Sequence, residues 1–293
     1  MRPQAASLKY KPYFYIAPAM LSYGIFVLYP SLASFWYSFT EWDGLSRPRF
    51  IGFANYTKAL FDDPLVWIAL KNNLIFMLFF AAIPLALGLL LASLIGRSRL
   101  KGINMFRVGL FMPQVVPLVA VGVIWSWIYN PAFGVLNNLL TIIGVRQWGR
   151  AWLGDFDVAI MAVGGIGAWL WYGFCMVIFL AGMQKIDEAL YDAAKLDGAH
   201  AIRQFWHITL PELQREITVC LVMTLTGALR VFAVVYVTTN GGPGTSTLPI
   251  SLYVFKNAFE YNRMGYATSI AVLLTLLIFL VVIITIHVRE ERL

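Results

Sequence analysis

Long stretches without a charged residue constrain this chain more than any other feature. A helix needs about 20 mostly apolar residues to cross the hydrocarbon core of a bilayer. Five charge-free runs meet this length, and a sixth is interrupted only by Arg230. The six runs cover residues 13–39, 72–96, 108–129, 158–183, 217–239 and 265–286. Only 13% of the residues are charged, against about 25% in soluble domains. The sequence therefore predicts an all-α integral membrane protein with six transmembrane helices in a single domain, 1–293.

The distribution of Lys and Arg predicts the orientation of these helices, because cytoplasmic loops are enriched in basic residues. Basic residues gather in both terminal tails and in two loops. They are Arg2, Lys9, Lys11, Arg97, Arg99, Lys101, Arg107, Lys185, Lys195, Arg203, Arg215, Arg289 and Arg292. We expect both termini and the loop 184–215 to face the cytoplasm in a multi-pass cell-membrane protein. The same enrichment accounts for the net charge of +7, so no nucleic-acid partner is expected.

Several spans carry residues that interrupt a regular helix. Pro113 and Pro117 lie within the third run, and proline removes a backbone donor. Broken helices are tolerated in membranes where they line cavities or meet other helices. Arg230 lies in the fifth span, where a central Arg costs about 2.5–3.5 kcal/mol and usually faces a bundle interior or a water-filled cavity. Gly164 and Gly167 in the fourth span favour close approach of a neighbouring helix.

The loop 184–215 contains signals for a short amphipathic helix. Asp187 can cap the start of the helix, and Gly198 can end it in a left-handed conformation. Ala193 and Ala194 leave a flat face, and the acids Asp192 and Asp197 on either side can pair with arginines of another protein. The alternative is an ordinary solvated loop helix.

No catalytic constellation accompanies these features. His200, His207 and His287 are scattered, without paired carboxylates or metal-ligand spacing. The glycine-rich stretch after the fifth span lacks the Gly-Lys-Ser/Thr ending of a phosphate-binding loop. Cys175 and Cys220 fall in apolar segments, which indicates packing rather than a disulfide or a metal site. We expect no enzyme activity, no metal and no cofactor in this chain.

The loop sequence from Glu188 to Ala199, followed by Phe205, Ile208, Leu210 and Pro211, resembles the EAA loop of permease subunits in bacterial ABC importers. It is most similar to the carbohydrate branch, the maltose and glycerol-3-phosphate type. Further matches occur at 50–56, 112–113, 236–243, 258–259 and 265–268, and the Gly-Gly-Pro stretch is typical of the first of two permease subunits. Two positions depart from the family pattern: Asp192 replaces a Glu, and Ala233 replaces an acid found in many relatives.

The resemblance implies the ABC type I importer permease fold and a set of partners. These would be a second permease subunit, two copies of a cytoplasmic ATP-binding subunit, an extracytoplasmic solute-binding protein and membrane lipid. ATP and Mg would bind to the ATPase subunits and not to this chain. Coupling to those subunits would use residues of the EAA loop. They are Asp192, Ala193, Ala194, Asp197, Gly198 and Pro211.

A second group of residues is a hypothesis for the solute pathway, because aromatic faces and polar tips suit sugar rings. It consists of Trp169, Tyr172, Arg230, Phe232 and Tyr236. The alternative for each aromatic residue is packing between helices or against lipid. The solute would be an oligosaccharide, a disaccharide or a glycerol-phosphate-like compound. An amino-acid or peptide permease, or an ion-coupled secondary transporter, remains an alternative, although no convincing internal repeat supports the latter.

Overall fold

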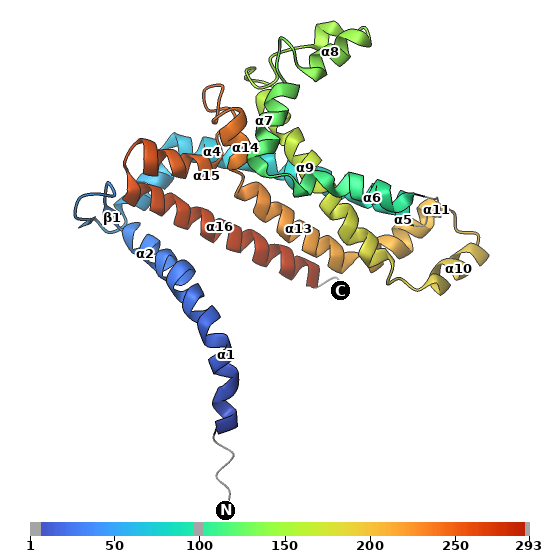
Figure 1. Ribbon diagram of the computed structural model, residues 1–293, viewed down its shortest axis with the longest axis horizontal. Coiled ribbons are helices and arrows are strands. Elements are labelled where there is room, and N and C mark those ends of the chain that lie inside the picture. Colours follow the sequence, from blue (N-terminus) through green and yellow to red (C-terminus); the bar gives the residue numbers. More distant parts are fainter. Residues whose placement is uncertain (1–6, 97–101, 291–293) are drawn as a thin grey trace, which may run out of the picture. The chain divides into compact units, whose positions relative to one another are not determined.

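The computed structural model of the chain describes residues 7–96 and 102–290 and is predominantly helical (Figure 1). Its contacts group the residues into two compact units. One unit comprises residues 1–63 and 254–273, and the other comprises residues 64–253 and 274–293. Five of the basic residues used above to orient the chain lie outside the described residues. They are Arg2, Arg97, Arg99, Lys101 and Arg292.

The apolar runs form membrane-spanning helices, as predicted. Five described helices are long and apolar enough to cross a membrane: 15–37, 64–96, 159–183, 214–238 and 264–289. A further pair, Ile103–Val115 and Leu118–Ile128, makes a sixth span if both parts are counted together. This pair is bent by 99° instead of forming the continuous helix 108–129. The second span also begins at residue 64 and not at 72, because the helix continues through the charged Lys71, after which the charge-free run began.

The first unit contains α1 (Ser7–Tyr23), the π-helical turn η1 (Gly24–Leu28) and α2 (Tyr29–Tyr37). A short antiparallel pair, β1 (Thr40–Glu41) and β2 (Arg49–Phe50), follows α2 and precedes α3 (Ala54–Thr57) and η2 (Lys58–Asp62). The buried Asn55 amide donates to the carbonyl oxygens of Ser38 and Thr40. Sequence patterns did not predict this strand pair.

The second unit contains most of the remaining helices. They are α4 (Pro64–Met77), η3 (Leu78–Ala82), α5 (Ile83–Gly96), α6 (Ile103–Phe111), η4 (Met112–Val115), α7 (Leu118–Ile128), α8 (Val135–Ile142), η5 (Arg146–Trp148), α9 (Ala159–Met183), α13 (Gln214–Leu229) and α14 (Ala233–Thr238). The chain then continues through α15 (Ile250–Phe255), η7 (Lys256–Glu260) and α16 (Met264–Glu290). Helix α9 packs along α5 and η3 (Figure 1). A Cβ at Gly167 of α9 would overlap the Phe80 ring, which explains the small residue at this close approach.

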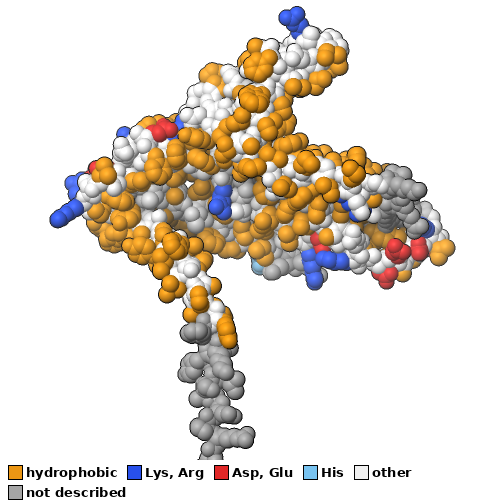
Figure 2. Space-filling model, viewed as in Figure 1, with side chains coloured by type: hydrophobic (Ala, Val, Ile, Leu, Met, Phe, Trp, Pro, Cys, Tyr) orange, Lys and Arg blue, Asp and Glu red, His pale blue; other side chains and the backbone are white. Residues whose placement is uncertain are grey.

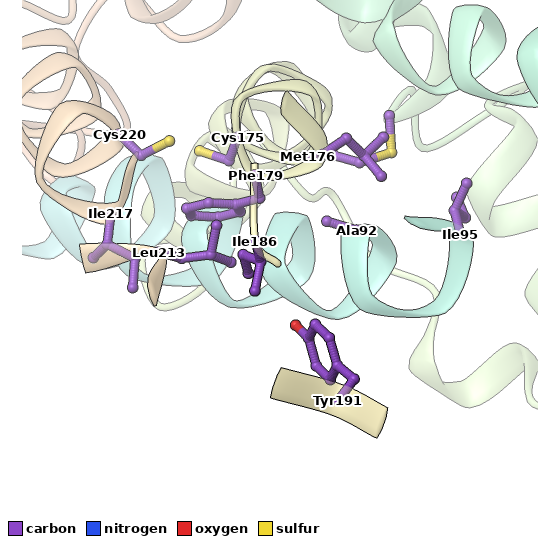
Figure 3. Packing of buried hydrophobic residues seen from close by; sticks show 11 residues of the cluster. Ala92, Ile95, Cys175, Met176, Phe179, Ile186, Tyr191, Leu213, Ile217 and Cys220 are labelled. Atoms are coloured by element: carbon purple, nitrogen blue, oxygen red, sulfur yellow. The ribbon is translucent and has the colours of Figure 1, made fainter. Parts of the chain in front are cut away.

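A buried cluster joins α5, α9 and α13 at one end of these helices (Figure 3). Phe179 of α9 and Leu213 beside α13 are fully buried in it. Cys175 and Cys220 lie within the same cluster and form no disulfide with each other. Tyr191 of the loop points into this cluster (Figure 3). The loop is therefore anchored in the packed ends of three spans.

Apolar side chains also cover much of the outer surface (Figure 2). On α16, Phe279 and Ile283 are 61% and 60% exposed. In the span 15–37, none of the most hydrophobic window is buried. Apolar surface of this extent faces lipid or other subunits and not water.

Candidate functional site

A cavity of about 790 Å³ lies in the second unit, between two interrupted spans and α9. Both interruptions contribute to its wall, as do two residues of α9 and one of η3. The lining residues are Phe80, Gln114, Val115, Val116, Pro117, Leu118, Leu170, Trp171, Met223, Thr226, Gly227, Arg230, Val231, Phe232, Ala233 and Val234. Irregular backbone at membrane depth occurs where it is buried in protein or lines a cavity. Both helix breaks meet this condition, because both line the cavity.

The first interruption follows from Pro113 and Pro117. Pro113 is the second residue of the 3-10 turn η4, and Pro117 is the N-cap residue of α7, with an extended ψ of 133°. The helix axis turns by 99° between the two segments. No side chain caps the start of α7. Its first N–H groups therefore have no intrahelical acceptor, and they lie at the cavity wall next to Leu118.

The second interruption separates α13 from α14 at Arg230, Val231 and Phe232. A helix that ends inside the membrane leaves carbonyl groups that need donors. Asn73 of α4 supplies them: its Nδ2 donates to the carbonyl oxygens of Ala228 and Leu229 at 3.0 and 3.2 Å. Its Oδ1 accepts from the backbone N–H of Ile250 at 2.8 Å. Asn73 is fully buried, so this side chain fixes the position of the break.

Asn72 holds the segment that follows the break. Its amide donates to the carbonyl oxygens of Thr245 at 2.9 Å and Leu248 at 3.0 Å. Within that segment, Thr247 Oγ1 donates to the Gly242 carbonyl at 2.8 Å. Asn240 and Gly241 have positive φ angles of 49° and 88°, which let the chain turn abruptly after α14.

Arg230 brings a positive charge to the cavity. Its side chain is exposed in the single chain and lines the cavity wall. No described acidic oxygen lies within 4.0 Å of its guanidinium. No described Asp, Glu or Lys lines the cavity, so Arg230 is the charged group among its lining residues. Ala233, whose methyl group carries no charge, also lines the cavity.

The residues of the predicted solute pathway lie in different surroundings. Arg230 and Phe232 line the cavity, and Tyr236 stacks on Phe232 with ring centroids 5.3 Å apart. Trp169 instead packs edge-to-face on Trp125 at 5.6 Å. Tyr172 is half-buried on α9 and is not among the residues that line this cavity. The roles of all five in solute passage stay predictions.

Sequence reasoning did not select three lining residues with useful chemistry. Trp171 lies over Gly227 of α13, where a Cβ would come within 2.7 Å of the indole. Phe80 adds a second aromatic ring and Gln114 a polar tip. A signal existed for Gln114, which stands between the two prolines that break the third span. Trp171 differs from Trp169 only in the face of α9 that it occupies, and no periodic pattern in this largely buried helix identified that face.

The loop 184–215 folds as the sequence predicted. Helix α10 (Glu188–Leu196) begins at Asp187, whose Oδ1 accepts from the Ala189 N–H at 3.0 Å. It ends at Leu196, and Gly198, two residues later, has a φ of +73°. The segments α11 (Ala201–Gln204), η6 (Phe205–Thr209) and α12 (Leu210–Glu212) follow. His200 caps α11 by accepting from the Arg203 N–H at 3.4 Å.

Two polar contacts attach α10 and its turn to the following segments. The Tyr191 hydroxyl is hydrogen-bonded to Oγ1 of Thr209 at 2.9 Å. The Gln204 amide donates to the Ala199 carbonyl at 2.8 Å. Tyr191, Gln204 and Thr209 are all buried. One face of α10 is therefore tied to the spans, and the opposite face is free to contact another protein.

That opposite face contains most of the predicted coupling residues. Asp192, Ala193, Asp197, Gly198 and Pro211 are exposed, and Ala194 is half-buried. The Asp192 carboxylate pairs with Nζ of Lys195 at 2.8 Å, a surface contact worth about 0–1 kcal/mol. Apolar side chains accompany these residues: Leu196 is 91% exposed and Trp206 is 59% exposed. The loop thus presents a mixed acidic and apolar surface. This surface does not face lipid chains, because its carboxylates require water or cations.

These features define a multi-pass α-helical membrane protein with a cavity at two interrupted spans and an anchored loop helix outside them. Residues 85–292 match the family described as binding-protein-dependent transport system inner membrane component. The chain belongs to this family and is a membrane subunit of such a transport system.

Relatives of known designation agree with this assignment. The chain is 38% identical to the probable ABC transporter permease protein YurN of Bacillus subtilis, over 89% of each chain. It is 32% identical to the lactose transport system permease protein LacF of Rhizobium radiobacter, over 95% of this chain and 93% of the relative. A solved bacterial ABC transporter involved in the import of the acidic polysaccharide alginate has the same fold: the TM-score is 0.82, with 24% identity over 97% and 96% of the two chains.

Proposed function

We propose that this chain is a permease subunit of an ATP-driven carbohydrate importer. In this proposal the cavity at Arg230 is part of the solute route, and an extracytoplasmic binding protein delivers the sugar. A second permease subunit completes the route. Two ATP-binding subunits dock on α10 from the cytoplasm and bind the ATP and Mg that drive the cycle. Both termini then lie on the cytoplasmic side, with the loop.

The observation that carries the proposal is the two-faced character of α10. Its inner face is fixed to α5, α9 and α13 through Tyr191, and its outer face presents Asp192, Asp197 and Leu196 to a partner. A partner that moves α10 therefore moves the ends of the spans that surround the cavity. This is the connection that a nucleotide-driven shift between two packed arrangements needs. The permease designations of several relatives, among them lactose and arabinooligosaccharide systems, support a sugar as the solute.

Subunit composition provides the first test. The chain is purified in mild detergent from cells that express its native operon, and the complex is weighed by native mass spectrometry. We expect one copy of this chain, one second permease and two ATP-binding subunits. A lone chain or homo-oligomer that transports solute on an ion gradient without ATP would overturn the proposal.

A pair of substitutions tests the docking surface. Leu196→Asp places a charge on the most exposed apolar residue of α10, and Leu45→Asp is the matched control in a turn of the first unit, where Leu45 is 95% exposed. We expect Leu196→Asp to lower the amount of ATP-binding subunit in the purified complex, because burial of an unpaired charge at an interface is unfavourable. Leu45→Asp is expected to retain both copies. Equal retention in the two variants would remove α10 as the docking site.

A further inference from the structure

We infer that the cavity selects carbohydrates that carry an anionic group, and that Arg230 binds this group. Carboxylate, sulfonate and phosphate share the required chemistry. The inference rests on the proposed function, because it assigns a substrate class to the same cavity. It adds that charge, and not only ring shape, decides which sugar is accepted.

The first support is the unbalanced charge of the cavity. Arg230 has no described acidic partner within 4.0 Å, and no described acid lines the wall. A charged side chain within a membrane normally pairs with another group or faces water. Ala233, on the same wall, offers only a methyl group where an Asp could have neutralised the guanidinium. This chain therefore keeps a cation available to a ligand.

The second support is the orientation of α7. Its uncapped N-terminal end lies at the same wall, at Pro117 and Leu118. Free N–H groups and the positive end of the helix dipole favour an anion there. Helix and side chain contribute independently, because α7 and Arg230 come from different interrupted spans. The guanidinium alone provides the planar, forked donor set that matches carboxylate and phosphate oxygens.

The remaining lining fits a sugar ring attached to that group. Trp171, Phe80 and Phe232 provide aromatic surface, and Gln114 and Thr226 provide hydrogen-bonding tips. The volume of about 790 Å³ falls within the range of about 300–1,000 Å³ that is typical of small-molecule sites. The cavity therefore combines a surface for a ring with a site for a charge.

Binding to the purified complex, without the binding protein, tests the inference. The probes are cellobiose and cellobiouronic acid, which differ by one carboxylate, and glucose and glucose 6-phosphate, which differ by one phosphate. Dissociation constants come from ligand-observed NMR. In the wild-type complex we expect the anionic member of at least one pair to bind at least tenfold more tightly. Arg230→Gln is expected to reduce this preference below threefold, and Arg230→Lys is expected to keep most of it.

Ala233→Asp tests the same point without removing Arg230. The new carboxylate pairs with the guanidinium, so the preference for the anionic probe is expected to fall at least tenfold. Ala233→Asn adds a similar volume without charge and is expected to keep the preference for the anionic probe. This pair of variants separates charge from crowding in the cavity.

Three results would overturn the inference. They are equal binding of charged and neutral probes to the wild type, binding of no anionic probe at millimolar concentration, and loss of the second permease from the Arg230→Gln complex. The last result would mean that Arg230 pairs with an acid of the partner. None of them changes the subunit composition or the ATP hydrolysis of the wild-type complex, so failure here is distinct from failure of the proposed function.

Discussion

Replacement of Asn73 by Leu removes the side chain that holds the break between α13 and α14. Three hydrogen bonds are lost, to the carbonyls of Ala228 and Leu229 and from the N–H of Ile250. Each hydrogen bond contributes about 0.6–1.5 kcal/mol to stability, the range found for hydrogen bonds in membrane and soluble proteins. We therefore expect the free energy of unfolding to fall by about 2–4 kcal/mol, since Leu has the same branched shape and number of side-chain heavy atoms as Asn and leaves no cavity.

The assay is SDS-induced unfolding of the purified complex, followed by tryptophan fluorescence and solute uptake in proteoliposomes. Asn104→Leu is the matched control, because Asn104 is exposed on α6 and surface substitutions usually change stability by less than about 0.5 kcal/mol. We expect only Asn73→Leu to lower uptake, because its loss frees the backbone next to Arg230. If Asn73→Leu destabilised the protein no more than Asn104→Leu, the assigned role of Asn73 would be refuted.

Three further predictions concern the loop and the first unit. Gly198→Val strains a backbone with a φ of +73° by about 1–2 kcal/mol and is expected to leave ATP hydrolysis without solute uptake. Gly198→Asn is expected to keep both activities, because Asn tolerates this conformation. Normal uptake by the Val variant would contradict the prediction. Tyr191→Phe removes the bond to Thr209 and is expected to lower stability by about 0.5–1.5 kcal/mol, measured by the same SDS titration against Tyr15→Phe, which is exposed. The N–H groups of Ser46 and Leu45, together with the Ser46 hydroxyl, lower the pKa of Asp43 from 3.8 to about 2. The stabilisation of this turn is therefore present above pH 3.8 and is lost as the pH falls through about 2. NMR of the Asp43 carboxyl should give a titration midpoint at that pKa, and Ser46→Ala should raise the midpoint.

The parts of the fold that sequence predicted are those governed by local chemistry. Hydropathy located the spans, and Asp187 and Gly198 marked both ends of α10, because a cap and a positive φ depend only on neighbouring residues. The prolines also indicated that the third span is interrupted. These features require no knowledge of distant contacts.

The parts that sequence missed depend on contacts between remote residues. Asn73 lay inside the predicted run 72–96, but no sequence pattern singled it out, because its partners lie 155 to 177 positions later in the chain. The break after Leu229 becomes stable only when those partners are in place. The inward position of Trp171 likewise depends on contact with Gly227 of another helix. Periodicity carries no information about such pairings.

The uninterrupted course of α9 has a mechanical consequence. This helix has 25 residues, which makes it a rod roughly 37 Å long at about 1.5 Å per residue. It carries Trp171 at the cavity and ends at Met183, with 184–187 leading directly into α10. Trp171 lies 12 residues before Met183, which is roughly 18 Å along the rod, so one degree of tilt about the loop end moves it by about 0.3 Å. A tilt of a few degrees at the loop would therefore displace the cavity wall by about 1 Å, with leverage set by the length of helix between them.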